Sequence, residues 1–278
     1  MARGDTKGGH KLKGIGVSSW TIPFEGEELF RWAKEQGLDT ISPGFDYDAC
    51  RTEDGMRRWC RTWSELSEKY GIALSILGVN TLCEVGMNRK EKWEEVKNIL
   101  RTAAAAASRM GAAAMHLPSF VDGEIRNKEE LEQTIVCLQY ACELGMQYQV
   151  EIGHEAVLSV PEYEYILEKV DSPAFYMLFD NENLSLKEMD PAYIYSRFAD
   201  KFRHAHLKNS NPANGYPQIL SENNCFGGVG RVLEEMQKNG FAGWIVSETD
   251  YKKARSKTEG TGMLLSDVRY IKSYLQKE

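Results

Sequence analysis

Two of the five histidines, His204 and His206, lie two residues apart in the stretch FRHAHLKNS at residues 202–210. This stretch is typical of a β-strand, in which alternate side chains point to the same face. We therefore expect both imidazoles on one face and Ala205 on the other. An imidazole at the end of a strand can ligate a metal, and a second one beneath it can support the first.

Acidic residues lie in three other predicted strands. Glu151 is in QYQVEIG (147–153), Asp180 ends AFYMLFD (174–180) and Glu248 is in GWIVSET (243–249). Val150 and Ile152 flank Glu151, and Phe179 precedes Asp180. These apolar residues suit the outer, helix-facing side of a strand, so the two carboxylates are predicted to face inward. Carboxylates that meet in a buried place repel one another unless a cation or protonation offsets their charge. Such residues can also cap the following helix, but four inward-facing groups on successive strands favour a metal site over capping.

Glu151, Asp180, His206 and Glu248 are thus predicted to hold one divalent metal ion. Three carboxylates and one imidazole suit a hard ion that tolerates nitrogen. Mn²⁺ is our first choice, with Mg²⁺, Co²⁺, Fe²⁺ or Zn²⁺ as alternatives.

Further polar and aromatic residues are expected around this site. We place His204 one layer below His206 as a hydrogen-bonded support or a substrate contact. His116, at the end of the strand predicted at 112–117, is equally consistent with substrate contact and with a satisfied core residue. Asn183 and Trp20 are candidates for binding substrate, whereas His154 and Glu155 are expected in a loop.

These residues require a repeating order of strands and helices to bring them together. Short apolar runs predict eight strands, at residues 14–20, 39–45, 72–79, 112–117, 147–153, 174–180, 202–208 and 243–249. Helical periodicity predicts helices at 26–37, 56–71, 90–111, 128–145, 161–170, 190–200, 229–239 and about 257–276. Eight β-α units predict a single (β/α)8 TIM barrel over residues 13–278, in which active sites lie at the carboxyl ends of the strands.

Other features of the chain complete the prediction. A flexible arm is expected over residues 1–12, and the Asn-, Gly- and Pro-rich stretch 210–228 is expected to be a functional loop. A doubly wound sheet is the second choice, but no G-x-G-x-x-G follows the first strand.

Composition narrows the function classes. The 278 residues carry a net charge of −7 and no long basic block, which argues against a nucleic-acid partner. No apolar run approaches the length of a membrane span. The six cysteines include no C-x-x-C pair, so we expect reduced thiols in a cytoplasmic protein.

The order of these motifs resembles the xylose isomerase-like sugar phosphate isomerase/epimerase superfamily. The resemblance rests on Glu in the fifth strand, LFD in the sixth, HAHLKN in the seventh and WIVSE in the eighth, together with GGVGRVLEEMQKNGFAGWIVSE. It covers roughly residues 13–275.

The resemblance implies an activity and catalytic roles. In the ketose 3-epimerase branch, one metal is held by Glu, Asp, His and Glu, and the two glutamates exchange the substrate proton. Those roles would fall on Glu151 and Glu248. The expected reaction is isomerisation or epimerisation of a sugar or sugar derivative, by proton abstraction next to a carbonyl through a metal-stabilised enediolate.

This chain departs from the family pattern in one place. Members often carry Asp-x-x-His after the sixth strand, whereas DNEN places Asn183 there, an amide that is a poor metal ligand. The chain also lacks the additional histidines of the type IV apurinic endonucleases, which argues against that branch. We place Lys208 on the outer face of its strand, and no residue points to a phosphorylated substrate.

Two alternatives to the isomerase stay open. A lyase or dehydratase of the inosose type would use the same metal site, and a non-catalytic sugar-binding or accessory barrel would use the pocket alone. The expected partner is a small carbohydrate. A homo-oligomer is suggested only by analogy with the family.

Overall fold

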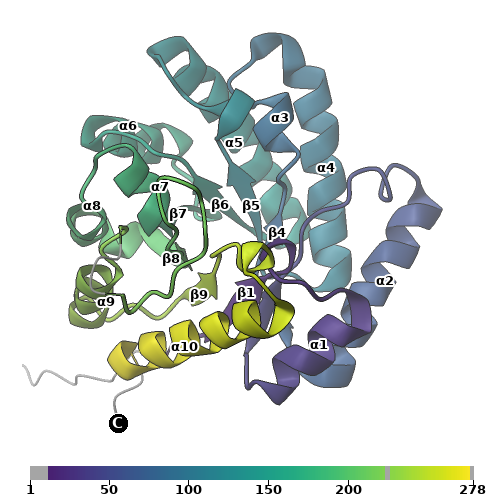
Figure 1. Ribbon diagram of the computed structural model, residues 1–278. Coiled ribbons are helices and arrows are strands. Elements are labelled where there is room, and N and C mark those ends of the chain that lie inside the picture. The colour runs from purple at the N-terminus through teal and green to yellow at the C-terminus, as the bar shows by residue number, and fades with distance from the viewer. Residues whose placement is uncertain (1–11, 223–225, 276–278) are drawn as a thin grey trace, which may run out of the picture.

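The structure is a computed structural model that describes residues 12–222 and 226–275. Within these residues the chain forms a nearly closed barrel of parallel strands with helices outside it (Figure 1). The arm predicted over residues 1–12 lies outside the described residues except for Leu12, which is buried. The strands are β1 (Gly14–Ser18), β2 (Thr40–Ser42), β3 (Ala73–Leu74), β4 (Leu77–Gly78), β5 (Ala114–Pro118), β6 (Glu151–Glu155), β7 (Phe175–Asp180), β8 (Phe202–Leu207) and β9 (Trp244–Ser247).

The predicted TIM barrel is confirmed, with one strand in two pieces. The strands pair in the order β3-β2-β1-β9-β8-β7-β6-β5-β4, and all pairs are parallel. β3 and β4 are consecutive pieces of the strand predicted at 72–79. One piece pairs with β2 and the other with β5, so this strand brings the two ends of the sheet together.

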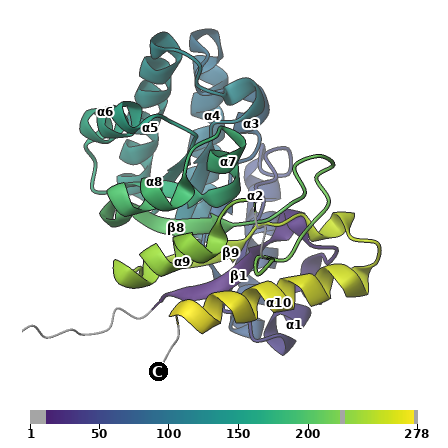
Figure 2. The same cartoon turned by 60° about the vertical axis from the view of Figure 1, so that its left-hand side comes forward.

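Helices follow the strands and cover the outside of the barrel (Figures 1 and 2). They are α1 (Gly26–Glu35), α2 (Glu53–Tyr70), α3 (Leu82–Val85), α4 (Trp93–Met110), α5 (Lys128–Tyr148), α6 (Val160–Val170), α7 (Asn181–Leu186), α8 (Pro191–Arg197), α9 (Val229–Lys238) and α10 (Lys257–Leu275). The short α3 and α7 were not predicted. Among the helices that the structure describes, none is long and apolar enough to cross a bilayer.

Local sequence signals explain where several helices begin and end. The Thr52 hydroxyl accepts a hydrogen bond from the Gly55 amide at 3.1 Å and caps the start of α2. Gly71 ends that helix with a φ of 63°, a conformation that glycine adopts without strain. Ser159 and Glu162 form a capping box at the start of α6.

The end of α5 differs from the prediction. We expected this helix to stop at Gly145, but it runs on to Tyr148, and Gln149 ends it with a φ of 58°. A non-glycine residue seldom takes this conformation. Position 145, within the helix, requires glycine for close packing, because a Cβ there would come 2.6 Å from the carbonyl oxygen of Val150. The strand that follows therefore starts at Glu151 instead of Gln147.

The alternation of side chains in β7 is confirmed. Tyr176 and Leu178 lie inside the barrel in a small cluster with Ile76 and Ala114. Phe179 lies in the larger core between sheet and helices. Inward positions on this strand therefore lead to Asp180 at its carboxyl end.

The chain between β8 and α9 is long, as predicted for residues 210–228 (Figure 2). Asn209 donates from its side chain to the Ile219 carbonyl at 2.9 Å. The Leu220 amide donates at 2.7 Å to Asp267 on α10. These bonds attach the described part of the loop to the barrel beside the carboxyl ends of the strands.

Candidate metal centre

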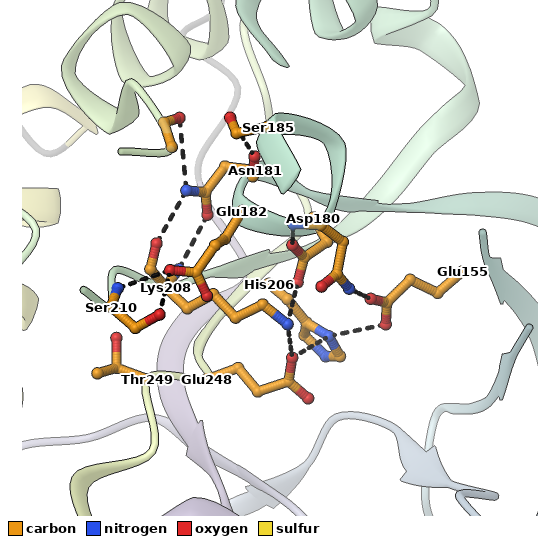
Figure 3. Close-up of polar contacts among 12 residues, drawn as sticks. Glu155, Asp180, Asn181, Glu182, Ser185, His206, Lys208, Ser210, Glu248 and Thr249 are labelled. Carbon is orange, nitrogen blue, oxygen red and sulfur yellow. Dashed lines mark hydrogen bonds and ion pairs between the residues drawn. The ribbon is translucent and has the colours of Figure 1, made fainter. Parts of the chain in front are cut away.

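Four side chains meet at the carboxyl ends of successive strands (Figure 3). Glu155 ends β6, Asp180 ends β7, His206 lies near the end of β8, and Glu248 directly follows β9. Each offers a ligand atom, and these atoms all lie within 4.8 Å of one another. Three of the side chains are buried and that of Glu248 is 11% exposed. The prediction of Asp180, His206 and Glu248 as neighbours at the barrel mouth is confirmed.

The prediction of Glu151 as the fourth member was wrong, and Glu155 occupies that place. Glu151 is the first residue of β6, at the opposite end of the barrel, where it forms an ion pair with Arg203. Glu151 and Glu155 share one face of the strand but are four residues, or about 13 Å, apart. The inward face was predicted correctly, but the strand was placed too early because α5 continues past Gly145.

His154 and Glu155 are therefore strand residues, and the predicted loop begins after them. The His154 ring lies 2.9 Å from the Ser119 hydroxyl. Burial lowers the pKa of this fully buried histidine to about 3, so its ring is neutral.

Glu155 is surrounded by nitrogen atoms. Its Oε2 lies 2.7 Å from His116 Nε2 and 3.1 Å from His206 Nδ1. Its Oε1 accepts a hydrogen bond from Asn183 Nδ2 at 2.8 Å. Burial raises the pKa of Glu155, but the imidazoles of His116 and His206 outweigh burial and hold this pKa well below its usual value.

His206 faces two carboxylates. Its Nδ1 is 3.1 Å from Glu155 Oε2 and 3.3 Å from Glu248 Oε2. Burial lowers the pKa of His206, but the charges of Glu248 and Glu155 outweigh it and raise the pKa to about 10. The imidazole consequently carries a proton at neutral pH, and a metal ion could bind this ring only by displacing a proton.

The two remaining carboxylates differ in their protonation. Burial raises the pKa of Glu248, but His206 and Lys208 bring it down to about 2. Burial raises the pKa of Asp180 to about 7 against the opposing charge of Lys208. The cluster thus contains two ionised glutamates and an aspartate that titrates near neutrality.

Lys208 enters the cluster, contrary to our prediction that it faces outward. Its Nζ lies 2.9 Å from Asp180 Oδ2 and donates to Glu248 Oε2 at 3.1 Å. Residues 204, 206 and 208 share one parity, so alternation along β8 continues into the site.

Asp180 also starts a helix. Its Oδ1 accepts a hydrogen bond from the Asn183 amide at 2.7 Å, which caps α7. Of the two alternatives weighed for a strand-end acid, capping is therefore present at Asp180, and the same side chain also lies in the cluster of possible metal ligands.

Two residues that the sequence did not single out hold the neighbouring loop. The Asn181 side chain bonds both backbone groups of Lys208, accepting from its amide at 2.9 Å and donating to its carbonyl at 2.9 Å. Glu182 accepts from the amide and the hydroxyl of Ser210, at 2.6 and 2.8 Å. The run DNEN directly after a strand was the available signal, since short polar side chains there favour caps and turns.

Trp20 and His204 lie on two sides of the cluster. Trp20 Nε1 donates to Glu248 Oε1 at 3.2 Å. Its ring occupies the space beside Gly78, where a Cβ would come within 2.7 Å of it. His204 lies below His206, with ring centroids 5.6 Å apart and planes at 89°.

The predicted hydrogen bond of His204 is not present. Neither of its ring nitrogens has a hydrogen-bond partner among the residues described. Burial lowers its pKa well below the usual value, and His206 adds to this effect, so the ring is neutral. The position of His204 fits packing beneath His206 better than contact with a substrate.

The sequence is similar to one protein-family profile and to two named enzymes. The sequence profile of the xylose isomerase-like TIM barrel family matches residues 30–274. The chain is 26% identical over 244 residues to 2-epi-5-epi-valiolone 7-phosphate 2-epimerase of Actinoplanes sp., covering 86% of this chain and 87% of that protein. It is 25% identical over 133 residues to inosose dehydratase of Lacticaseibacillus casei, which is 42% of this chain and 44% of that protein.

Solved structures show the same fold at lower identity. D-allulose 3-epimerase from Methylomonas sp. superposes with a TM-score of 0.75 and 14% identity, covering 95% of this chain and 99% of that chain. The 3-keto-D-glucoside 4-epimerase of E. coli has a TM-score of 0.73 and 12% identity, covering 95% and 100%. The match over residues 30–274 shows that the chain belongs to the xylose isomerase-like TIM barrel family, as the order of its strand-end residues suggested.

Proposed function

We propose that the protein is a divalent-metal-dependent isomerase or epimerase of a sugar or sugar derivative. The observation that carries this proposal is the meeting of Glu155, Asp180, His206 and Glu248 within 4.8 Å at the barrel mouth. Support comes from the relatives, which include 2-epi-5-epi-valiolone 7-phosphate 2-epimerase and solved structures of D-allulose 3-epimerase and 3-keto-D-glucoside 4-epimerase.

The four residues fit a divalent ion by their chemistry. Three carboxylate groups and one imidazole provide the donors that Mn²⁺, Mg²⁺, Co²⁺ or Fe²⁺ prefers, and Mn²⁺ stays our first choice. A bound ion would polarise the carbonyl of the substrate and stabilise the negative charge that develops when a neighbouring proton leaves. His116, Glu155 and His206 form an overlapping set of three ligands, which is a second way to hold the ion.

Glu155 and Glu248 are the proposed proton carriers, with Glu155 in the role first given to Glu151. They approach His206 Nδ1 from two different strands, at 3.1 and 3.3 Å. Because both have a pKa below the usual value, both are ionised and able to accept a proton at neutral pH. One carboxylate can remove the proton next to the carbonyl and keep it, and the other can take up a proton from solvent and return that proton from its own side.

A pocket beside the cluster offers a place for the rest of the substrate. It has a volume of about 230 Å³ and is lined by Ser119, Phe120, Val121, Glu124, Val157, Asn183, Leu186 and Lys187. Asn183 borders this pocket while its amide bonds Glu155. We therefore keep Asn183 as a candidate for binding substrate hydroxyl groups. His116 and Trp20 stay candidates because they contact the proposed ligands Glu155 and Glu248.

The decisive experiment follows the carbon-bound proton. The Mn²⁺-loaded protein is incubated in D2O with a panel of ketoses that includes D-allulose, and with inosose. We expect deuterium to appear next to the carbonyl of at least one compound, read by NMR and mass spectrometry. Glu155→Gln should abolish this exchange, whereas Glu151→Gln, on the same face of the strand, should retain it. A metal-loaded protein that binds sugar without any exchange would favour the non-catalytic barrel.

A dehydratase is the second candidate, favoured by the partial match to inosose dehydratase. It would begin with the same proton removal but would then expel a β-hydroxyl group. Loss of water from inosose, seen as a product 18 mass units lighter, separates the two activities.

A further inference from the structure

A lysine ammonium lies inside the proposed metal centre, beside the proposed ligands. The Lys208 ammonium lies 2.9 Å from Asp180 Oδ2 and 3.1 Å from Glu248 Oε2, between two of the four proposed ligands. Its side chain is only 16% exposed. Asn181 holds the backbone of the same residue by two hydrogen bonds, so the ammonium is directed into the cluster from a fixed base.

The charges in this small space can be counted. With His206 neutral and Asp180 ionised, the states in which both could ligate an ion, the three carboxylates and the ammonium sum to a net charge of minus two. One divalent ion would bring that sum to zero. Without Lys208, the same loaded centre would keep one negative charge. Unpaired charge is costly in a buried site, so this balance has consequences for both the metal-free and the loaded protein.

We propose that Lys208 is a positioning residue that acts as a built-in counter-charge, weakening the affinity of the centre for divalent ions while stabilising the metal-free fold. The proposal rests on the proposed function, because it concerns the same four ligands. In the metal-free protein the ammonium offsets the repulsion between Asp180 and Glu248. When an ion enters, it shares those carboxylates with a positive charge that repels it. The result is a centre that stays folded when empty and exchanges its ion readily.

The test compares three variants with a matched control. Lys208→Met removes the charge and keeps most of the stem, Lys208→Gln can still donate a hydrogen bond, and Lys208→Arg keeps the charge. Lys201→Met is the control, because Lys201 directly precedes β8, pairs with Asp200 and has a side chain that is 47% exposed. Mn²⁺ and Mg²⁺ affinities are measured by calorimetry at one fixed pH, and thermal unfolding is recorded with and without metal.

We expect Lys208→Met and Lys208→Gln to bind Mn²⁺ about 10 to 100 times more tightly than the unaltered protein. Their melting temperature without metal should fall, and addition of metal should restore it. Lys208→Arg and Lys201→Met should stay near the unaltered protein in both measurements. If Lys208→Met folds only with metal present, that too supports the counter-charge, and Lys208→Gln supplies the affinity.

Unchanged or weaker Mn²⁺ binding by a folded Lys208→Gln would overturn the inference. Lys208 would then hold the carboxylates in place without opposing the ion. This failure differs from failure of the proposed function: if the unaltered protein binds no divalent ion and exchanges no substrate proton, the metal-dependent activity itself is refuted.

Discussion

The two glutamates of β6 show how position along one strand decides what a side chain can do. Glu151 and Glu155 lie on the same face, at the amino and carboxyl ends of the strand. The Glu151 side chain is 35% exposed and pairs with Arg203, whose side chain is 42% exposed. The Glu155 side chain is 4% exposed and lies among two imidazoles and an amide. Both residues are glutamates, so their different surroundings decide which of them has a lowered pKa and lies among possible metal ligands.

The largest difference should appear when each glutamate is replaced by glutamine. Glu155→Gln removes a proposed ligand and proton carrier while keeping the shape of the side chain. We expect at least a 100-fold loss of Mn²⁺ affinity, since even partners of metal ligands contribute 10- to 100-fold. Calorimetry gives the affinity. Glu151→Gln should bind Mn²⁺ normally, and equal losses in both variants would remove the contrast between the two ends of the strand.

Metal binding should depend on pH, because two proposed ligands at the carboxyl end of the barrel have raised pKa values. The raised pKa of His206, about 10, means that a metal ion displaces a proton from this imidazole at any pH below that value. Asp180, with a pKa of about 7, adds a second displaced proton at lower pH. Affinity should thus rise with pH, by about tenfold per unit above pH 7 and more steeply below it. Calorimetry in buffers of different ionisation enthalpy counts the protons, and an affinity that is constant from pH 6 to 8 would contradict this assignment.

A smaller effect is expected from the amide that supports Glu155. Asn183→Ala removes the 2.8 Å hydrogen bond to Glu155 Oε1 but leaves the Asn183 backbone amide, which Asp180 caps. We expect about a tenfold loss of Mn²⁺ affinity and an intact fold by circular dichroism. Affinity equal to that of the unaltered protein would show that Glu155 is held by the imidazoles alone.

The smallest effect should come from the partner of Glu151. Arg203→Met breaks an exposed ion pair, and such pairs contribute about 0–1 kcal/mol to the free energy of unfolding. Urea unfolding should therefore change by less than about 1 kcal/mol, with Mn²⁺ affinity unaltered. A loss of metal binding here would mean that the two ends of the barrel are coupled.

Most of the fold was predictable because each strand is a short apolar run and several helices end at glycine. Asp180, His206 and Glu248 were found because their strands end where the apolar pattern ends. Glu155 was missed because α5 ends at Gln149 in a conformation that no sequence rule assigns to glutamine. A useful signal was present downstream: the capping box of Ser159 and Glu162 fixes the start of α6, and counting back from it places the strand end near Glu155.

Two other contacts of the site differ in how far the sequence could have predicted them. Lys208 follows the alternation of His204 and His206, so its inward direction could have been deduced from parity. The contact of Trp20 with Glu248 joins residues 228 positions apart, and the sequence contains no pattern that pairs them.

The cap that Asp180 provides to α7 makes the Asn183 amide hydrogen a natural reporter of the site. That hydrogen bonds Oδ1 of the same carboxylate whose Oδ2 faces Lys208. An ion bound to this carboxylate would reduce the electron density on Oδ1 and so weaken its hydrogen bond with the amide. The frequency with which the first turn of α7 opens would change as well. The hydrogen-exchange rate and chemical shift of a single backbone group would then follow occupancy of the centre, with no substrate or chromophore required.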